Sequence, residues 1–351
     1  MVGDRGGEQR QARALLTMRQ PSDRVFELAY SFRQTRVLVS ALELGVFAEL
    51  QRAPANEEEL RGRLGLHPRG ARDFLDALVG LGLLERDAGG IYANAPTASR
   101  HLVPGEPGYL GGLVAYVTAA EYPGWNGLTG ALRSGRPADR PGAGDDLYAT
   151  LYANPDAVDQ FTRAMSAATL PVAEALAEAF PWRECRTVVD VGCAEGCLPV
   201  TLALRHPHIS GGGFDLPAVR PAFERYVRIH GLARRLIFHG GDFLRDELPS
   251  AEVLVLGRVL HNWNLATKRL IIGKAHAALP PDGALIVYDR MIDDERRSAP
   301  ALLASLNMLV MTEGGFDFSA TQCTEWLAEA GFRDLESAPL AAGQSMVVGR
   351  R

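Results

Sequence analysis

The sequence predicts an α/β protein in which a doubly wound, mostly parallel sheet follows an all-helical N-terminal domain of winged-helix type. Three observations lead to this prediction. From residue 181 to the C-terminus, short apolar strands alternate with helical segments. One of these strands, at residues 187–191, is rich in valine and runs into a glycine turn. In the N-terminal part, apolar residues recur at helical spacing and a short hairpin follows them.

The composition indicates a globular protein and gives no sign of a nucleic-acid or membrane partner. The 351 residues are 47% hydrophobic and 23% charged, with a formal net charge of −5. A negative chain does not attract DNA, RNA or an anionic membrane, and no apolar run approaches the ~18 residues that span a bilayer. The polar N-terminus lacks the features of a secretory signal. The four cysteines are not spaced as metal ligands, so we expect packing roles for them and a cytoplasmic location.

Residues 21–103 are predicted to form the winged-helix domain, after a disordered tail at residues 1–20. Between residues 21 and 50, apolar residues form two helical faces, which is more than one helix needs against a small core. This stretch therefore either holds two helices or is buried between subunits. Asn56 and Pro68 mark the starts of the next two helices, and a diglycine turn then separates two short strands.

A winged helix raises the possibility of DNA binding, but its charges argue against that function. Arg69 and Arg72 lie on the second helix of the motif. Asp73, Asp76 and the run Glu57–Glu59 offset them. Because the whole chain is negative, a packing role is favoured over contact with DNA.

Residues 104–180 are predicted to form a helical connector that supplies a pocket wall. The first part is rich in proline and glycine but also carries aromatic residues, which need a surface to pack on. A long helical segment at residues 156–179 then leads to the valine-rich strand. The catalytic domain is predicted to occupy residues 181–351.

The glycine turn after the valine-rich strand is predicted to hold a nucleoside. Asp190 lies at the strand end, Gly192 allows a turn conformation that residues with a β-carbon avoid, and Gly196 lets the next helix approach the ligand closely. Asp215 follows by roughly 20 positions, the interval at which such folds place a carboxylate against ribose hydroxyls. The spacing G-x-x-x-G lacks the dense glycines of a pyrophosphate loop. Flanking acids, Asp190 and Glu195, favour the cationic groups of S-adenosylmethionine, although an ordinary βα turn has the same pattern.

The remaining elements indicate a parallel sheet covered by helices on both faces. Predicted strands at 236–238, 253–256, 284–289 and 345–349 alternate with predicted helices at 221–230, 268–278, 301–311 and from 319 to 331. Such sheets bind ligands beyond the carboxyl ends of their strands. Asp215, Asp242, His261 and Asp289 all follow apolar strands, so we expect them at one edge of the sheet.

Five motifs, in this order and spacing, resemble small-molecule O-methyltransferases that depend on S-adenosylmethionine. They are Asp190–Gly196, Gly213–Pro217, Gly240–Phe243, Arg258–Trp263 and Gly314–Gly315. Similar families include the plant caffeate and flavonoid enzymes, acetylserotonin O-methyltransferase and bacterial natural-product tailoring enzymes. The resemblance covers nearly the whole chain, and it implies a class I methyltransferase fold, a homodimer formed through the N-terminal domain and a small, aromatic acceptor.

The resemblance implies roles for individual residues. His261 matches a general base, and Asp289 and Asp317 match acidic positions that orient it. Together with Asp190 of the glycine turn, the expected cofactor-binding residues are Gly192, Asp215, Leu216, Asp242, Phe243 and Arg258. Family position and apolar character suggest Trp125, Phe161, Met165, Asn307, Met308 and Met311 for the acceptor pocket, although each is also a plausible core residue.

The expected chemistry is proton removal from a phenol, whose pKa near 10 calls for a base such as His261. A histidine that caps a helix is the alternative structural explanation. The chain has His261-Asn262-Trp263 where the family usually has His-Asp-Trp. Asn262 is a poor metal ligand, so we expect no metal.

The departures from the family pattern leave the accepting atom open. A C- or N-methyltransferase of the same fold remains an alternative. A DNA-binding or cofactor-sensing protein and a nicotinamide oxidoreductase are further alternatives. The charge balance disfavours the former, and the missing middle glycine disfavours the latter.

Overall fold

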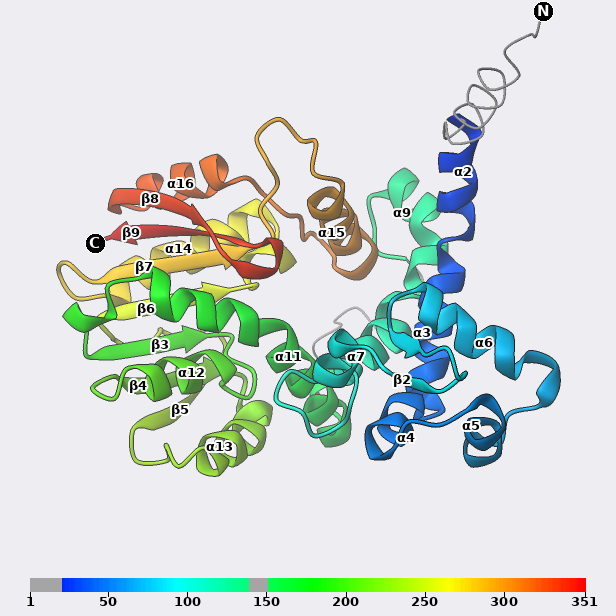
Figure 1. Ribbon diagram of the computed structural model, residues 1–351. Coiled ribbons are helices and arrows are strands. Elements are labelled where there is room, and N and C mark those ends of the chain that lie inside the picture. Colours follow the sequence, from blue (N-terminus) through cyan, green and yellow to red (C-terminus); the bar gives the residue numbers. More distant parts are fainter. Residues whose placement is uncertain (1–20, 139–150) are drawn as a thin grey trace, which may run out of the picture. The chain divides into compact units, whose positions relative to one another are not determined.

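The computed structural model describes residues 21–138 and 151–351 (Figure 1). It forms two compact units, the first ending at Gly111 and the second beginning at Gly112. The predicted disordered tail, and residues 139–150 of the predicted connector, lie outside the described residues. The domain boundaries expected at residues 103 and 180 stay a prediction.

The N-terminal unit is helical apart from one small hairpin. Its elements are α2 (Pro21–Tyr30), α3 (Phe32–Glu43), α4 (Val46–Arg52), α5 (Glu57–Leu64), α6 (Pro68–Gly80), β1 (Leu84–Arg86), β2 (Tyr92–Asn94) and α7 (Pro96–His101). The predicted helical stretch at residues 21–50 thus comprises three helices, and Gly45, with φ of 74°, starts the third. Asn56 and Glu59 form the predicted capping box of α5. Buried Phe47, Leu75 and Tyr92 belong to the core of the unit.

Apolar side chains remain exposed on α2 and at the start of α3. Val25, Phe26, Leu28, Tyr30 and Phe32 are between 47% and 66% exposed. Large apolar residues scattered singly are normal on a protein surface, whereas a run along one helix suggests a surface that another chain covers.

The second unit contains a seven-stranded sheet in the order β5-β4-β3-β6-β7-β9-β8. The strands are β3 (Thr187–Val191), β4 (Ser210–Asp215), β5 (Leu236–Gly240), β6 (Val253–Gly257), β7 (Ala284–Asp289), β8 (Arg333–Pro339) and β9 (Ser345–Arg350). The first five are parallel, and β9 pairs antiparallel with β7 and β8. The strand order reverses between β3 and β6. Their carboxyl ends therefore form the switch point at which doubly wound sheets bind ligands.

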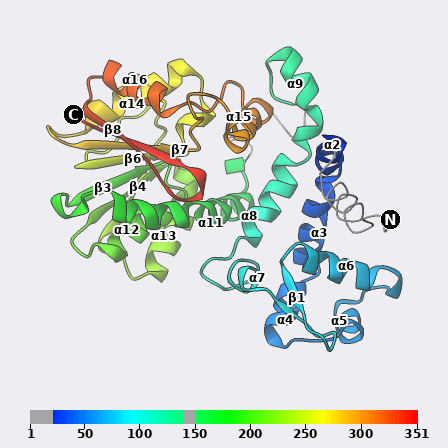
Figure 2. The ribbon, with the colours of Figure 1, turned by 45° about the horizontal axis from the view of Figure 1, so that its top comes forward.

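Helices cover both faces of this sheet (Figures 1 and 2). One face packs on α14 (Leu265–Ala278) and α16 (Ala320–Glu329), and the other on α11 (Pro155–Ala179) and α12 (Cys197–Arg205). Because neighbouring strand residues point to opposite faces, Val253 and Val255 of β6 enter one core cluster while Leu254 and Leu256 enter the other. This double burial explains the apolar runs from which the sheet was predicted.

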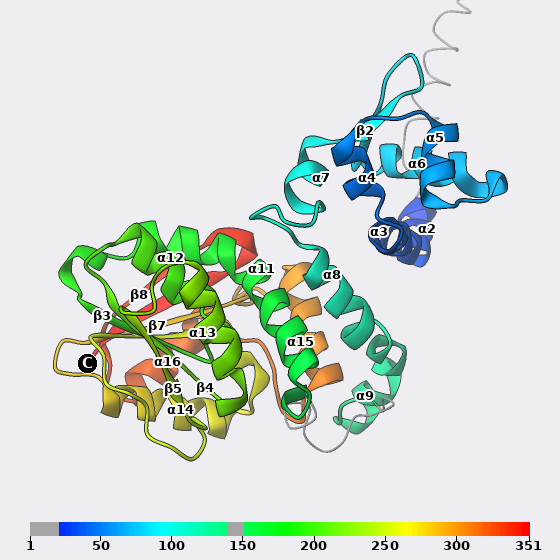
Figure 3. The same cartoon turned by 90° about the horizontal axis from the view of Figure 1, so that it is seen from below.

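The second unit also contains α9 (Leu128–Ser134), α13 (Arg220–Ile229) and α15 (Ala299–Met311), and α8 (Gly111–Tyr116) begins at the last residue of the first unit. Helix α15 contacts α9, as Figure 3 shows from below. Of the helices within the described ranges, none is long and apolar enough to cross a membrane.

The structure corrects the predicted elements in two places. Strand β8 was not predicted, because it lies at the sheet edge, is largely exposed and has no apolar alternation. Helix α14 begins at Leu265 rather than Lys268. Its start is set by Asn264, whose side-chain oxygen accepts a hydrogen bond from the Thr267 amide at 3.0 Å.

Candidate active site

A cavity opens at the carboxyl ends of β3, β4 and β6, where the strand order reverses. Its volume is about 1120 Å³ when the space open to solvent is counted. Every residue that the sequence suggested for cofactor binding lines it. These are Asp190, Gly192, Asp215, Leu216, Asp242, Phe243 and Arg258. The cavity thus lies where doubly wound sheets hold nucleoside-containing ligands.

The glycine turn is held to the end of β4 by backbone and carboxylate hydrogen bonds. The Gly192 amide donates to the Phe214 carbonyl at 2.8 Å, and the Ala194 amide donates to Asp215 Oδ2 at 2.9 Å. Gly192 has φ of 79°, and a β-carbon there would lie 2.6 Å from the Val259 side chain. Glycine is therefore required here for both conformation and space.

The walls of the cavity carry more carboxyl groups than cationic side chains. Burial raises the pKa of Asp190 to about 8, and the nearby charge of Asp215 adds to this. Burial also raises the pKa of Asp215 to about 6, against the opposing effect of two backbone N–H donors. Among the described lining residues, Arg258 is the single lysine or arginine. Three carboxyl groups beside a single cation can accept hydrogen bonds from ribose hydroxyls and suit these better than a pyrophosphate.

Arg258 occupies a left-handed backbone conformation directly after β6. Its φ is 56°, and its amide donates to the Tyr288 carbonyl at 2.9 Å. Its guanidinium Nη1 lies 3.7 Å from the sulfur of Met165 on α11. A non-glycine residue in this conformation carries strain that the surrounding structure must offset.

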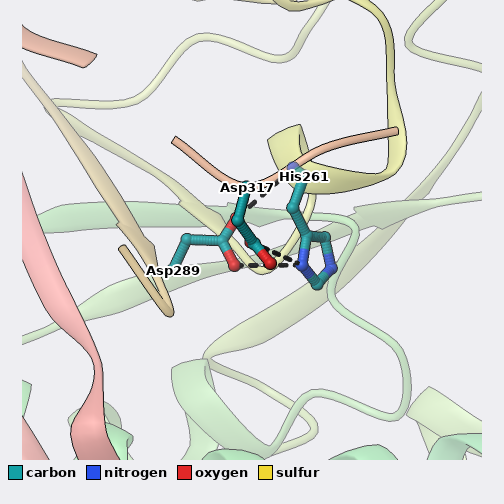
Figure 4. Close-up of side chains that lie close together, drawn as sticks. All are labelled: His261, Asp289 and Asp317. Carbon is teal, nitrogen blue, oxygen red and sulfur yellow. Dashed lines mark hydrogen bonds and ion pairs between the residues drawn. The ribbon is translucent and has the colours of Figure 1, made fainter. Parts of the chain in front are cut away.

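Beside the cavity, three side chains from separate elements meet (Figure 4). His261 lies in a single helical turn (η5, Leu260–Asn262), Asp289 ends β7, and Asp317 lies in the loop before α16. His261 Nδ1 is 3.2 Å from Asp289 Oδ1 and 3.3 Å from Asp317 Oδ1. The other ring nitrogen points away from both carboxylates.

The two carboxylates favour the protonated form of His261. Burial acts to lower the pKa of His261, but the charges of Asp289 and Asp317 outweigh it and raise the pKa above the usual 6.5. The Asp317 side chain is fully buried. Apart from its contact with His261, neither of its carboxylate oxygens has a hydrogen-bond partner among the described residues.

The same three side chains have the composition of a metal site. One candidate ligand atom from each lies within 4.8 Å of the others. A single proton on His261 already balances one carboxylate, and buried Lys268 nearby offsets further negative charge. The expectation that no metal binds stays a prediction.

The residues suggested for the acceptor pocket divide into two groups. Phe161 and Met165 of α11 line the cavity. Trp125, Asn307, Met308 and Met311 do not belong to its described lining, nor do His261, Asp289 and Asp317. Instead, Trp125 Nε1 donates to Asn307 Oδ1 at 2.8 Å, and Met311 packs with Val310 and Ala138.

Sequence reasoning missed several lining residues. Examples are Tyr152, Ser166 and Thr169 near or on α11, and Tyr288 on β7. Trp263 also lines the cavity, and its place in the His-Asn-Trp motif was a usable signal. For Tyr288 the sequence held a weaker signal. A β-carbon on Gly257 would lie 2.1 Å from its ring, so a glycine at the end of β6 marks the space that a large side chain fills.

Asn262 holds the turn that carries His261. Its side-chain amide donates to the Arg258 carbonyl at 3.2 Å and to the Val259 carbonyl at 3.3 Å. Only the NH₂ group can make these bonds, so the orientation of the amide follows from the chemistry. An ionised aspartate would have no proton to donate to either carbonyl.

We therefore expect Asn262→Asp to lower the free energy of unfolding by about 1–3 kcal/mol, because two carbonyls lose their donor. Asn264→Asp is the matched control. Asn264 accepts a hydrogen bond at a helix start, which aspartate does equally well, so its change is expected within ~0.5 kcal/mol. Denaturant titration of both variants measures the difference, and equal losses would contradict the donor role of Asn262.

Two family models match the chain in order. An O-methyltransferase dimerisation domain matches residues 26–104, and an O-methyltransferase domain matches residues 125–333. The chain is 42% identical over 335 residues to a tetracenomycin polyketide synthesis 8-O-methyl transferase of Streptomyces glaucescens, covering 95% of this chain and 98% of that protein. It is 39% identical to an N,N-dimethyltransferase of Streptomyces rimosus, with 88% and 90% covered.

Comparison with solved structures also finds a methyltransferase. Human N-acetylserotonin methyltransferase in complex with S-adenosylmethionine has a TM-score of 0.87 and 26% identity, over 95% of this chain and 99% of that one. A cavity lined by Asp190, Asp215 and Asp242, with Arg258 as the single lysine or arginine of its described lining, agrees with S-adenosylmethionine as the cofactor. Matched in both parts and similar to these relatives over most of its length, the chain belongs to the S-adenosylmethionine-dependent O-methyltransferase family.

Proposed function

We propose that the protein transfers a methyl group to a hydroxyl of a small aromatic natural-product intermediate, with His261 as general base. The observation that carries this proposal is the placement of His261 Nδ1 between two buried carboxylates, beside the cavity lined by Asp215. With Nδ1 held in this way, the other ring nitrogen is available to accept a proton.

The residues of the chain account for the acid–base part of the reaction. When bound, S-adenosylmethionine supplies a methyl group already activated on a sulfonium. His261 takes the hydroxyl proton, since a phenol with pKa near 10 is mostly protonated at pH 7. Asp289 and Asp317 fix the tautomer that leaves the second nitrogen free and stabilise the imidazolium that forms. Asp215 takes the ribose hydroxyls, and the other cavity residues exclude water around the cofactor.

An aromatic acceptor is supported by the surroundings of the cavity. Phe161 lines it and makes edge contacts with Tyr116 and Tyr152, whose ring centroids lie 5.5 Å and 6.4 Å away. Trp263 adds a further aromatic ring to the lining. Flat apolar rings favour a planar ligand. The named role of the 42% identical relative in polyketide synthesis agrees with this class of acceptor.

A nitrogen acceptor is the second candidate, because the 39% identical relative is an N,N-dimethyltransferase. A neutral amine already has a free lone pair and needs no base. The two candidates therefore differ in whether His261 is needed.

Product mapping separates them. The protein is incubated with ¹³C-methyl-labelled cofactor and a panel of polyphenolic polyketides and their amino analogues, and the products are examined by NMR. A methoxy carbon signal is expected. A labelled N-methyl or C-methyl product, with no methoxy signal from any phenol, would overturn the proposal.

The protein is also proposed to act as a homodimer through its N-terminal domain. Support comes from the matched dimerisation domain and from the exposed apolar side chains of α2 and α3. Sedimentation equilibrium should give twice the 37.9 kDa chain mass. Replacing Phe26 with arginine should shift the protein towards the monomer, and a wild-type protein that stays monomeric at micromolar concentration would exclude the dimer.

A further inference from the structure

We propose that Lys268 is a positioning residue for methyl transfer, joining the turn that carries His261 to the loop that carries Asp317. The inference rests on the proposed role of His261. Lys268 is a buried cation to which the proposed mechanism assigns no role.

Lys268 contacts both segments through a single ammonium group. It lies on α14 and is fully buried. Its Nζ donates to the Trp263 carbonyl and, at 2.9 Å, to the Phe316 carbonyl. Trp263 lies two residues after His261, and Phe316 directly precedes Asp317. One side chain therefore sets the separation of the two backbone segments from which the histidine and its carboxylate extend.

Aromatic rings complete the site of the ammonium. Nζ lies 3.4 Å from the centroid of the Phe316 ring and 5.5 Å from that of Phe318. Ring faces attract a cation, most strongly where water is excluded. A fully buried lysine is rare in proteins because its charge loses hydration. Here two carbonyls, two ring faces and two carboxylates offset that loss, so the arrangement is specific for a cation.

The charge of Lys268 also acts on the proton-accepting group. Burial lowers the pKa of Lys268 to about 8, while Asp289 and Asp317 oppose the change. The charged groups that face His261 are Asp289 from β7, Asp317 from the loop before α16 and Arg258 from the turn after β6. Lys268, from α14, faces the same two carboxylates. Its positive charge therefore reduces their pull on the imidazole proton and keeps more of His261 in the neutral, basic form.

Lys268→Met is the primary test, because methionine fills a similar volume without a charge or donor. We expect kcat to fall by about 10- to 100-fold, since small displacements of reacting groups cost that much. The acid limb of the kcat/KM profile should move to higher pH by about one pH unit. The KM for S-adenosylmethionine should change less than kcat, because Lys268 touches the cavity lining only through the backbone carbonyl of Trp263.

Two further lysine variants separate the charge from the hydrogen bonds. Lys268→Arg keeps both, so it should restore the wild-type pH profile. Lys268→Gln keeps a donor for a carbonyl but removes the charge, and should show the shifted profile with a smaller loss of kcat. If Lys268→Met does not fold, Lys268→Gln still tests the effect of the charge.

Arg269→Met is the matched control on the same helix. Arg269 makes an exposed ion pair with Glu329 at 2.8 Å, and exposed pairs contribute little. Its kinetics and pH profile should equal those of the wild type.

An imidazole NMR titration in cofactor-free protein gives a readout independent of turnover. The pKa of His261 should be higher in Lys268→Met and Lys268→Gln than in the wild type. If these variants lose thermal stability but keep the wild-type His261 titration and pH profile, Lys268 is only a structural residue and the proposal fails. If His261→Ala retains full turnover, the general-base function fails instead, while the titration still reports on Lys268.

Discussion

Replacing His261 with alanine is expected to lower kcat by ~10²–10⁴-fold, the usual contribution of a positioned general base. Cofactor affinity should change little, because His261 is not among the described residues that line the cavity. Its ring nitrogen Nδ1 is already engaged by two carboxylates, so the lost function is proton acceptance at the other nitrogen. Single-turnover kinetics with the identified acceptor, and calorimetry with S-adenosylhomocysteine, measure the two quantities.

The pH profile tests the same assignment without removing the base. Only neutral His261 can accept a proton, and its pKa is raised above 6.5, so activity should fall on the acid side from a pH above that value. Asp317→Asn removes one of the negative charges that hold the proton. It should therefore move the acid limb to lower pH while reducing kcat through poorer orientation. Full turnover by His261→Ala would refute the general base, and it would favour an amine acceptor.

The cofactor side of the site could be predicted from the sequence because strand order brings it together. Asp190 and Asp215 lie at the carboxyl ends of β3 and β4, Arg258 directly follows β6, and parallel strands present their carboxyl ends at one edge. The need for glycine in the turn after β3 also has a physical cause. Gly192 needs a left-handed backbone, and a β-carbon on it would collide with Val259.

The side chains around His261 were harder to predict from the sequence. Asp289 ends a strand, but Asp317 lies in a loop after α15, and only the family resemblance paired it with His261. Lys268 gave no signal, because a lysine within a predicted helix is ordinarily expected on the solvent side. Its ammonium binds the Trp263 carbonyl five residues earlier and the Phe316 carbonyl in a loop 48 residues later, and helical periodicity does not indicate the second contact. On α11, Phe161 and Met165 were predicted as pocket residues, whereas Ser166 and Thr169 were missed.

The second large effect is expected at Asp215. Asp215→Ala should weaken binding of S-adenosylhomocysteine by about 3–6 kcal/mol, or roughly 10²–10⁴-fold, if the carboxylate accepts two ribose hydroxyls. Asp215 also accepts hydrogen bonds from the Ala194 and Leu216 amides at 2.9 Å and 2.8 Å. Alanine would release the glycine turn as well. Asp215→Asn keeps the shape and one acceptor, so it should bind more tightly than the alanine variant but less tightly than the wild type.

The pH dependence of binding distinguishes a ribose-binding carboxylate from a residue that only shapes the turn. The pKa of Asp215 is about 6 in the cofactor-free protein, so affinity should fall as the pH drops through 6 and the acceptor becomes protonated. Stability of the cofactor-free protein should show the opposite trend. The folded-state pKa exceeds the ordinary 3.8, so the folded state binds more protons, and the contribution of Asp215 to stability decreases as the pH rises from about 4 to 6. Asp215→Asn should remove both trends, and an asparagine variant that keeps the acid-side loss of affinity would assign that loss to another group.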